Sequence, residues 1–128
     1  MPISYEIDAT TGLLNSVFTG KIPPRELLDW YDELQRHPDF RPDLTQIAEF
    51  RMSEADWTPD EMKEVVTREP FGPGARRAFV GPVDLIYGLA RMYSTFAETM
   101  GQGGQIEVFR TVEEARAWID ALPKEPDS

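Results

Sequence analysis

Three short apolar runs, each followed at once by a segment with helical spacing, constrain this chain more than any other feature. The runs are LTQIAEF (44–50), ARRAFV (75–80) and QIEVFR (105–110). Strands that alternate with helices imply crossover connections and therefore parallel pairing. We expect an α/β fold with a mainly parallel sheet.

The N-terminal residues predict a β-hairpin in front of these units. Apolar and polar residues alternate over 3–8, the turn DATTG follows at 8–12, and a second strand runs over 13–19. The hairpin adds an antiparallel pair, so the five-stranded sheet should be mixed, with the order ββαβαβαβα. Neither an internal repeat nor a long linker divides the chain, which predicts one domain over 1–122 and a flexible tail over 123–128.

Proline and capping signals predict where the helices begin. Pro23 and Pro24 open the first helix, because proline at the first helical position loses no intrahelical hydrogen bond. Thr58 and Thr111 each precede a glutamate by three residues, which is the capping-box spacing for the second and fourth helices. The fourth helix should present an apolar face made of Val112, Ala115, Ile119 and Leu122.

The turn at Gly81 and Pro82 raises the question of a phosphate site, because it joins a strand to the third helix. Such a site needs free backbone N–H groups at the helix start. We expect Gly81 near the N-cap and Pro82, which has no N–H, at the first helical position. Asp84 adds a negative charge there, and no glycine-rich nucleotide motif is present. We interpret the turn as a corner of the fold.

The acidic composition limits the partners of this chain of 128 residues. It has 23 acidic and 13 basic residues and a formal net charge of −10, which argues against binding to nucleic acids or to anionic membranes. The absence of cysteine excludes disulfides, thiolate nucleophiles and cysteine metal sites. Neither a signal peptide nor a membrane-spanning apolar stretch is recognisable, so we expect a cytoplasmic protein.

Residues suited to catalysis or metal binding are scarce. His37 is the only histidine, and we interpret it as a cap at the end of the first helix. One histidine without cysteine cannot build a usual zinc site, and no serine lies in a nucleophile-elbow context. Glu49 lies within an apolar strand and is interpreted as a residue of its solvated face. We therefore predict no enzyme activity, no cofactor and no metal.

Four arginines of the second half of the chain could gather around one anion: Arg68, Arg76, Arg77 and Arg91. Arg76 and Arg77 are adjacent on a strand, so they point to opposite faces and at most one joins a cluster. We expect these arginines on the solvated surface.

The third helix has an apolar arc that is wider than a usual core stripe. We expect the helix to pack on the sheet and against a neighbouring helix. The additional width leaves two further interpretations open, an apolar ligand pocket and a dimer face. The residues concerned are Leu85, Tyr87, Leu89, Met92, Tyr93 and Phe96.

Two segments carry a family resemblance that covers nearly the whole chain, from about Ile3 to Leu122. The segments RRAFVGPVDLIYGLARMYSTFAE and IEVFRTVEEARAWI resemble the bacterial SpoIIAA-like proteins, which are related to STAS domains. The resemblance implies a mixed sheet with helices mostly on one side. It also implies an architecture similar to that of Sec14-type lipid-transfer domains, which is a fold-level analogy.

STAS proteins switch partners when a serine or threonine at a helix start is phosphorylated, and the resemblance directs attention to Ser53 and Thr58. The family's Asp-Ser-Ser-Gly motif is absent from EFRMSEADWTPDEM. A phosphate at Thr58 would face Asp60 and Glu61, which would repel it. We interpret Thr58 as a helix cap.

Two functions therefore remain for the sequence. The first is a non-catalytic, STAS-like regulatory module that acts through a protein partner or a second copy of itself. The alternative is a carrier that holds a small apolar or amphipathic, lipid-like ligand between the third helix and the sheet.

Overall fold

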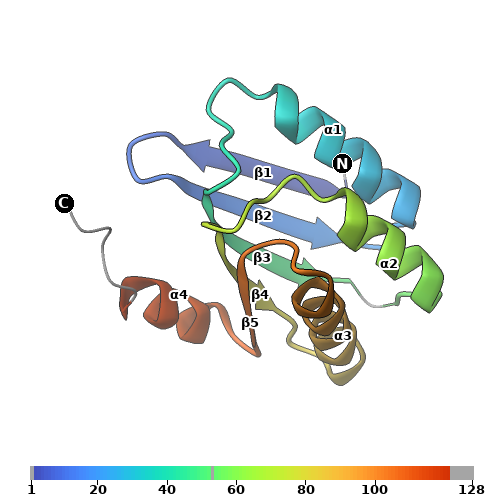
Figure 1. Ribbon diagram of the computed structural model, residues 1–128. Coiled ribbons are helices and arrows are strands. Elements are labelled where there is room, and N and C mark those ends of the chain that lie inside the picture. Colours follow the sequence, from blue (N-terminus) through green and yellow to red (C-terminus); the bar gives the residue numbers. More distant parts are fainter. Residues whose placement is uncertain (1, 53, 122–128) are drawn as a thin grey trace.

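The protein, described here by a computed structural model over residues 2–52 and 54–121, has the element order that its sequence predicts (Figure 1). Ser53, Leu122 and the tail over 123–128 lie outside the described residues, so the predictions made for them stay predictions. The strands are β1 (Ile3–Asp8), β2 (Leu13–Thr19), β3 (Thr45–Arg51), β4 (Arg76–Val80) and β5 (Gln105–Phe109). The helices are α1 (Pro24–Arg36), α2 (Pro59–Arg68), α3 (Asp84–Met100) and α4 (Val112–Ala121).

The five strands form one mixed sheet in the order β1-β2-β3-β4-β5. β1 pairs antiparallel with β2, and each of the other neighbouring pairs is parallel. This arrangement confirms the predicted hairpin and the parallel crossover units. The register places Gln46 opposite Arg77 and Ala48 opposite Phe79 on the two central strands β3 and β4.

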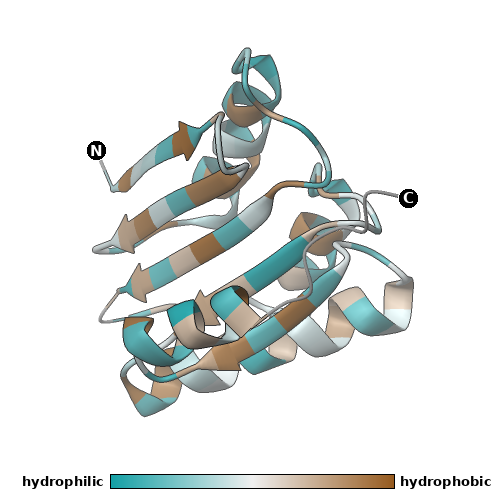
Figure 2. Ribbon diagram, turned by 90° about the vertical axis from the view of Figure 1, so that its left-hand side faces the viewer, coloured by the Kyte–Doolittle hydropathy of each residue, from teal (hydrophilic) through white to brown (hydrophobic). Residues whose placement is uncertain are grey.

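Three helices cover one face of the sheet, and α4 covers the other (Figure 1). The larger core contains Leu14 and Phe18 of β2 together with buried residues of α1, α2 and α3. The smaller core joins Ala115 of α4 to Ile47 and Ala78 of the central strands. Apolar and polar residues alternate along several strands, as Figure 2 shows. The strands therefore present separate sets of side chains to the two layers.

Local signals set most of the helix starts correctly. Pro24 is the first residue of α1, and both hydrogen bonds of the capping box at Thr58 are formed, at 2.8 and 3.1 Å. The hydroxyl of Thr111 accepts a hydrogen bond from the backbone N–H of Glu114 at 3.1 Å. The capping box predicted at Thr58 is thus confirmed. At Thr111 one of its two hydrogen bonds is formed, and the Thr111 hydroxyl instead donates to the Glu114 carboxylate at 3.1 Å.

The predicted start of the third helix was wrong by two residues, because α3 begins at Asp84 with Val83 as its N-cap. Gly81 directly follows β4, and its N–H donates to the carbonyl of Phe109, the last residue of β5, at 2.8 Å. A Cβ atom at Gly81 would lie 2.9 Å from the backbone of Tyr87, so glycine lets the helix pack closely on the end of β4. The Asp84 carboxylate occupies the first turn of α3 and accepts a hydrogen bond from Arg110 at 2.6 Å.

Within the described residues, no helix combines the length and the apolar character that crossing a membrane requires.

Candidate functional site

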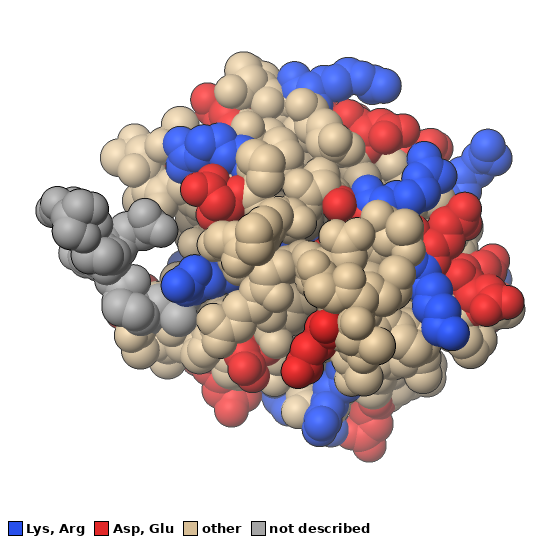
Figure 3. All heavy atoms as spheres, in the orientation of Figure 1, with Lys and Arg blue, Asp and Glu red and all other residues tan. Residues whose placement is uncertain are grey.

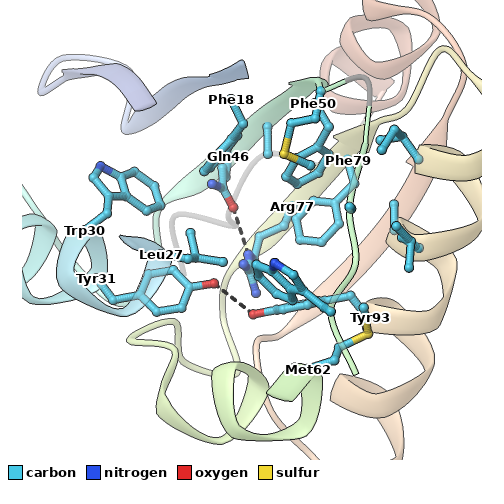
Figure 4. A pocket seen from close by; sticks show the side chains of 17 residues that line it. Phe18, Leu27, Trp30, Tyr31, Gln46, Phe50, Met62, Arg77, Phe79 and Tyr93 are labelled. Carbon is cyan, nitrogen blue, oxygen red and sulfur yellow. Dashed lines mark hydrogen bonds between the residues drawn. The ribbon is translucent and has the colours of Figure 1, made fainter. Parts of the chain in front are cut away.

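A cavity of about 70 Å³ lies between the sheet and the helices α1, α2 and α3 (Figure 4). Its walls come from all three helices, from β2, β3 and β4, and from the segment between β3 and α2. Among the 17 lining residues, the aromatic ones are Phe18, Trp30, Tyr31, Phe50, Trp57, Phe79 and Tyr93.

Two small residues leave this space open. Ala48 of β3 and Ala90 of α3 line the cavity and are 1% and 6% exposed. A larger aliphatic side chain at either position would extend into the space that the methyl groups leave free. Met62 of α2 and Met52 after β3 complete the apolar wall, and methionine adapts its shape easily.

The segment between β3 and α2 forms one side of the cavity. Met52, Ala55 and Trp57 of this segment line it and are half-buried. The indole N–H of Trp57 donates to the carbonyl of Ile22 at 2.8 Å, which attaches the segment to the connection between β2 and α1. The capping box at Thr58 fixes the next residue of the chain.

A buried ion pair lies beside the cavity. The Nη1 atom of Arg77 donates to Oε2 of Glu69 at 2.8 Å, and the side chains of these two residues are 2% and 0% exposed. Arg77 extends from β4, and Glu69 is the C-cap residue of α2. Phe71 lies 4.0 Å from the guanidinium carbon, measured to the ring centroid. Burial disfavours a charged guanidinium, but the attraction of Glu69, Tyr93 and Tyr31 together with the hydrogen bond to Glu69 outweighs it, so the pKa of Arg77 is raised.

Two tyrosines continue the polar cluster toward α1 and α3. The hydroxyl of Tyr93 donates to Oε2 of Glu69. The hydroxyls of Tyr31 and Tyr93 are 2.8 Å apart, and because the single proton of Tyr93 is directed to Glu69, Tyr31 is the donor of this pair. Burial raises the pKa of Tyr31 to about 12 and the pKa of Tyr93 well above its usual value. Both phenols are therefore neutral near pH 7.

The cluster also continues into the sheet. Nε of Arg77 donates to Oε1 of Gln46 at 2.9 Å, and Nε2 of Gln46 donates to the hydroxyl of Ser16 at 3.1 Å. That hydroxyl donates to the carbonyl of Ile47 at 3.2 Å. Figure 4 shows two of the contacts of this cluster, from Arg77 to Gln46 and from Tyr31 to Tyr93. We call the buried set Ser16, Tyr31, Gln46, Glu69, Arg77 and Tyr93 the polar network.

Gly103 closes the polar network on the side of the turn between α3 and β5. It has a positive φ of 79°, and a Cβ atom there would clash with the Glu69 carboxylate and the Arg77 guanidinium. Glycine is therefore required at this position for both its conformation and its size.

The two tyrosines of the polar network are neutral at physiological pH. Raised pKa values disfavour phenolate, so neither Tyr31 nor Tyr93 is suited to act as a base near pH 7. Over residues 2–52 and 54–121, no group of three or more histidine, aspartate or glutamate side chains could hold a metal ion. His37 lies at the C-cap of α1, where its Nδ1 accepts a hydrogen bond from the backbone N–H of Asp39 at 3.0 Å.

The structure separates the six apolar residues that the sequence analysis named on the third helix. Leu89 and Tyr93 line the cavity. Leu85 and Met92 are 53% and 41% exposed and point away from the core. The other two are half-buried and each lies against a cation, Tyr87 against Arg110 and Phe96 against Lys63.

The expectation that the arginines of the second half of the chain lie on the solvated surface was wrong for Arg77. It is 1% exposed, whereas Arg68 and Arg91 are exposed and Arg76 is partly exposed. Glu69 supplies the counter-charge that makes this burial tolerable. Glu49 lies on the opposite face of the sheet from the cavity and pairs with Arg51.

Sequence reasoning missed Tyr31, Gln46 and Glu69 as partners of Arg77. One usable signal was the strand period, because Gln46 and Arg77 both alternate with residues of the smaller core and must face the three-helix layer. The register between the two strands and the position of Glu69 come only from the folded chain.

Comparison of this sequence with protein-family models finds no match, and comparison with curated proteins finds no similar sequence.

Proposed function

We propose that this protein is a cytoplasmic binding domain that holds a small apolar ligand in the cavity between α3 and the sheet. One observation supports this proposal above all others. The cavity has aromatic and methionine walls and lies beside a polar network whose hydrogen bonds are made internally. Small-molecule sites are typically concave and mostly apolar, with a few placed polar groups.

Binding in the cavity should be visible as a change in stability. A ligand that packs against the lining residues binds the folded state selectively. It should therefore raise the free energy of unfolding.

Native mass spectrometry of protein purified gently from cells tests this proposal. We expect a bound mass that disappears on solvent denaturation and is reduced in the Ala90→Leu variant, whose larger side chain fills the cavity. Ala117→Leu on the exposed face of α4 is the matched control and should keep the bound mass. Circular dichroism establishes that both variants are folded. An equal bound mass in Ala90→Leu, or none in the native protein, would argue against the cavity as a binding site.

A second proposal, action through a protein partner or a second copy, is supported by a different observation. Leu85 and Met92 expose large apolar side chains on one side of α3, as Val83 and Met100 do near its ends. Such residues favour interaction with another surface when they are neighbours. The resemblance to SpoIIAA-like proteins belongs to this second proposal. Light scattering of Leu85→Lys and of the native chain tests it, since loss of a dimer mass in the variant is the expected result.

A further inference from the structure

We propose that the ligand of the cavity is an uncharged apolar molecule of about one ring, and that Glu69 sets this preference by neutralising Arg77. This inference rests on the proposed function and adds the chemical class of the ligand. An arginine beside an apolar cavity would ordinarily favour an amphipathic ligand with a carboxylate or phosphate head. The contacts of Arg77 indicate the opposite here.

The charge of Arg77 is already matched within the protein. Its Nη1 donates to Glu69 at 2.8 Å and its Nε donates to Gln46 at 2.9 Å. The proton of Tyr93 is also directed to Glu69, and the proton of Tyr31 to Tyr93. Two N–H groups of Arg77 and the hydroxyl protons of Tyr31 and Tyr93 are thus directed toward groups of the protein.

A ligand anion would also meet an existing negative charge. Oε1 of Glu69 is buried and has no hydrogen-bond partner within the described residues. A carboxylate placed beside Arg77 would compete for a guanidinium that already donates to Glu69 at 2.8 Å. Like charges in buried surroundings disfavour each other, so the Glu69 carboxylate opposes the binding of an anion there.

The aromatic residues around Arg77 limit its access to a ligand further. Phe71 and Phe79 lie 4.0 and 5.1 Å from the guanidinium carbon, measured to the ring centroids. The Arg77 side chain is only 2% exposed although the residue lines the cavity. On the face shown in Figure 3, residues other than Lys, Arg, Asp and Glu fill most of the centre. A ligand in the cavity meets mainly the apolar side chains that line it.

The volume of the cavity, which is partly open to solvent, favours a small ligand. An engineered core cavity of about 150 Å³ binds benzene, and the cavity here measures about 70 Å³. It does not enclose a lipid acyl chain in this conformation. Rotation of Met52 and Met62, which both line it, can provide the additional space that one ring requires.

Toluene and benzoate form a suitable pair of probes, because they share one ring and differ by a methyl or a carboxylate. Binding is followed by tryptophan fluorescence in a Trp118→Phe background, since Trp30 and Trp57 line the cavity and Trp118 packs against Phe109 on the other face. We expect the Trp118→Phe protein to bind toluene at least about tenfold more tightly than benzoate.

Glu69→Gln, which keeps the shape of the side chain but removes its charge, should reverse the preference. With Arg77 no longer neutralised, benzoate should gain at least about tenfold relative to toluene. Glu64→Gln on the exposed side of α2 is the matched control and should leave both affinities unchanged.

The outcomes separate this inference from the proposed function. Toluene binding without any change of preference in Glu69→Gln, or benzoate binding as tightly as toluene in the protein with Glu69, overturns the inference and leaves the cavity as a binding site. Failure of both probes to bind overturns the proposed function and the inference together. If Glu69→Gln does not fold, the inference is tested by the protein with Glu69 alone, which must bind toluene more tightly than benzoate.

Discussion

Replacement of Ala48 by valine should make this protein more stable, which is unusual for enlargement of a buried residue. Ala48 is 1% exposed and lines the cavity from β3. Valine adds two carbon atoms, and each buried methylene-sized group contributes about 0.8 kcal/mol. The expected gain is therefore about 1.6 kcal/mol. Valine also suits a strand.

Ala78 provides the matched control for this substitution. It is also a buried alanine of a central strand, with 0% exposure, but it faces α4 on the other side of the sheet. Ala78 does not line the cavity, so two additional carbon atoms there must displace packed neighbours. Overpacking of this kind typically costs about 1–3 kcal/mol. The two variants should therefore change the free energy of unfolding with opposite signs.

Urea unfolding, followed by circular dichroism and tryptophan fluorescence, measures both changes. If the slope of the free energy of unfolding against urea concentration is unchanged, the variants and the native protein unfold between the same folded and unfolded states. We expect the midpoint to rise for Ala48→Val and to fall for Ala78→Val, and toluene to stop stabilising the former. If Ala48→Val destabilises the protein as much as Ala78→Val does, the space beside Ala48 is filled. The proposed ligand site would then lose its structural basis.

Three further predictions concern the polar network and one helix cap. Arg77→Met should lower the free energy of unfolding in urea by about 3–5 kcal/mol, because it leaves Glu69 buried without a counter-charge. Adding Glu69→Leu should recover most of this loss, and a double variant no more stable than Arg77→Met would contradict the account. The pKa of Tyr31 is raised from 10.0 to about 12, so its stabilisation is complete below pH 10 and is lost as the pH rises toward 12. Two pKa units correspond to about 3 kcal/mol. Urea unfolding between pH 10 and 12 should show a steep fall in the free energy of unfolding, and this fall should be smaller in Tyr31→Phe. An equal fall in both proteins would contradict the raised pKa of Tyr31. Thr58→Ala should cost about 1 kcal/mol in thermal unfolding through the lost capping box, and no change would argue against it.

The fold was predictable from the sequence because its signals are local. The alternation in β1 and the capping box at Thr58 act over a few residues and agree with the final structure. The start of α3 was misplaced because a hydrogen bond attaches Gly81 to Phe109 of β5, which is 28 positions further along the chain. A contact of that kind leaves no trace in the local pattern.

The cavity was harder to predict because it depends on side chains that are distant in the sequence. Tyr31 and Tyr93 are 62 positions apart, and Gln46 and Arg77 are 31 apart. Arginine and glutamate are rarely buried, so the default interpretation places them in water. Arg77 can be buried because it pairs with Glu69. This ion pair forms only when the fold brings the C-terminus of α2 close to β4.

The polar network fixes the positions of the helices around the cavity, and this explains its presence better than its contribution to stability does. Buried ion pairs are often no more stabilising than apolar residues of the same size, so stability is a weak reason for this one. Its geometry gives a better reason. The hydroxyls of Tyr31 on α1 and Tyr93 on α3 meet at 2.8 Å, and Glu69 joins Tyr93 to Arg77 on the sheet. Hydrogen bonds fix such distances, whereas an apolar core would close around unfilled space. The same residues therefore fix the spacing of the helices over the cavity and neutralise the charge of Arg77 in its wall, so the shape of the cavity and its charge have a common origin.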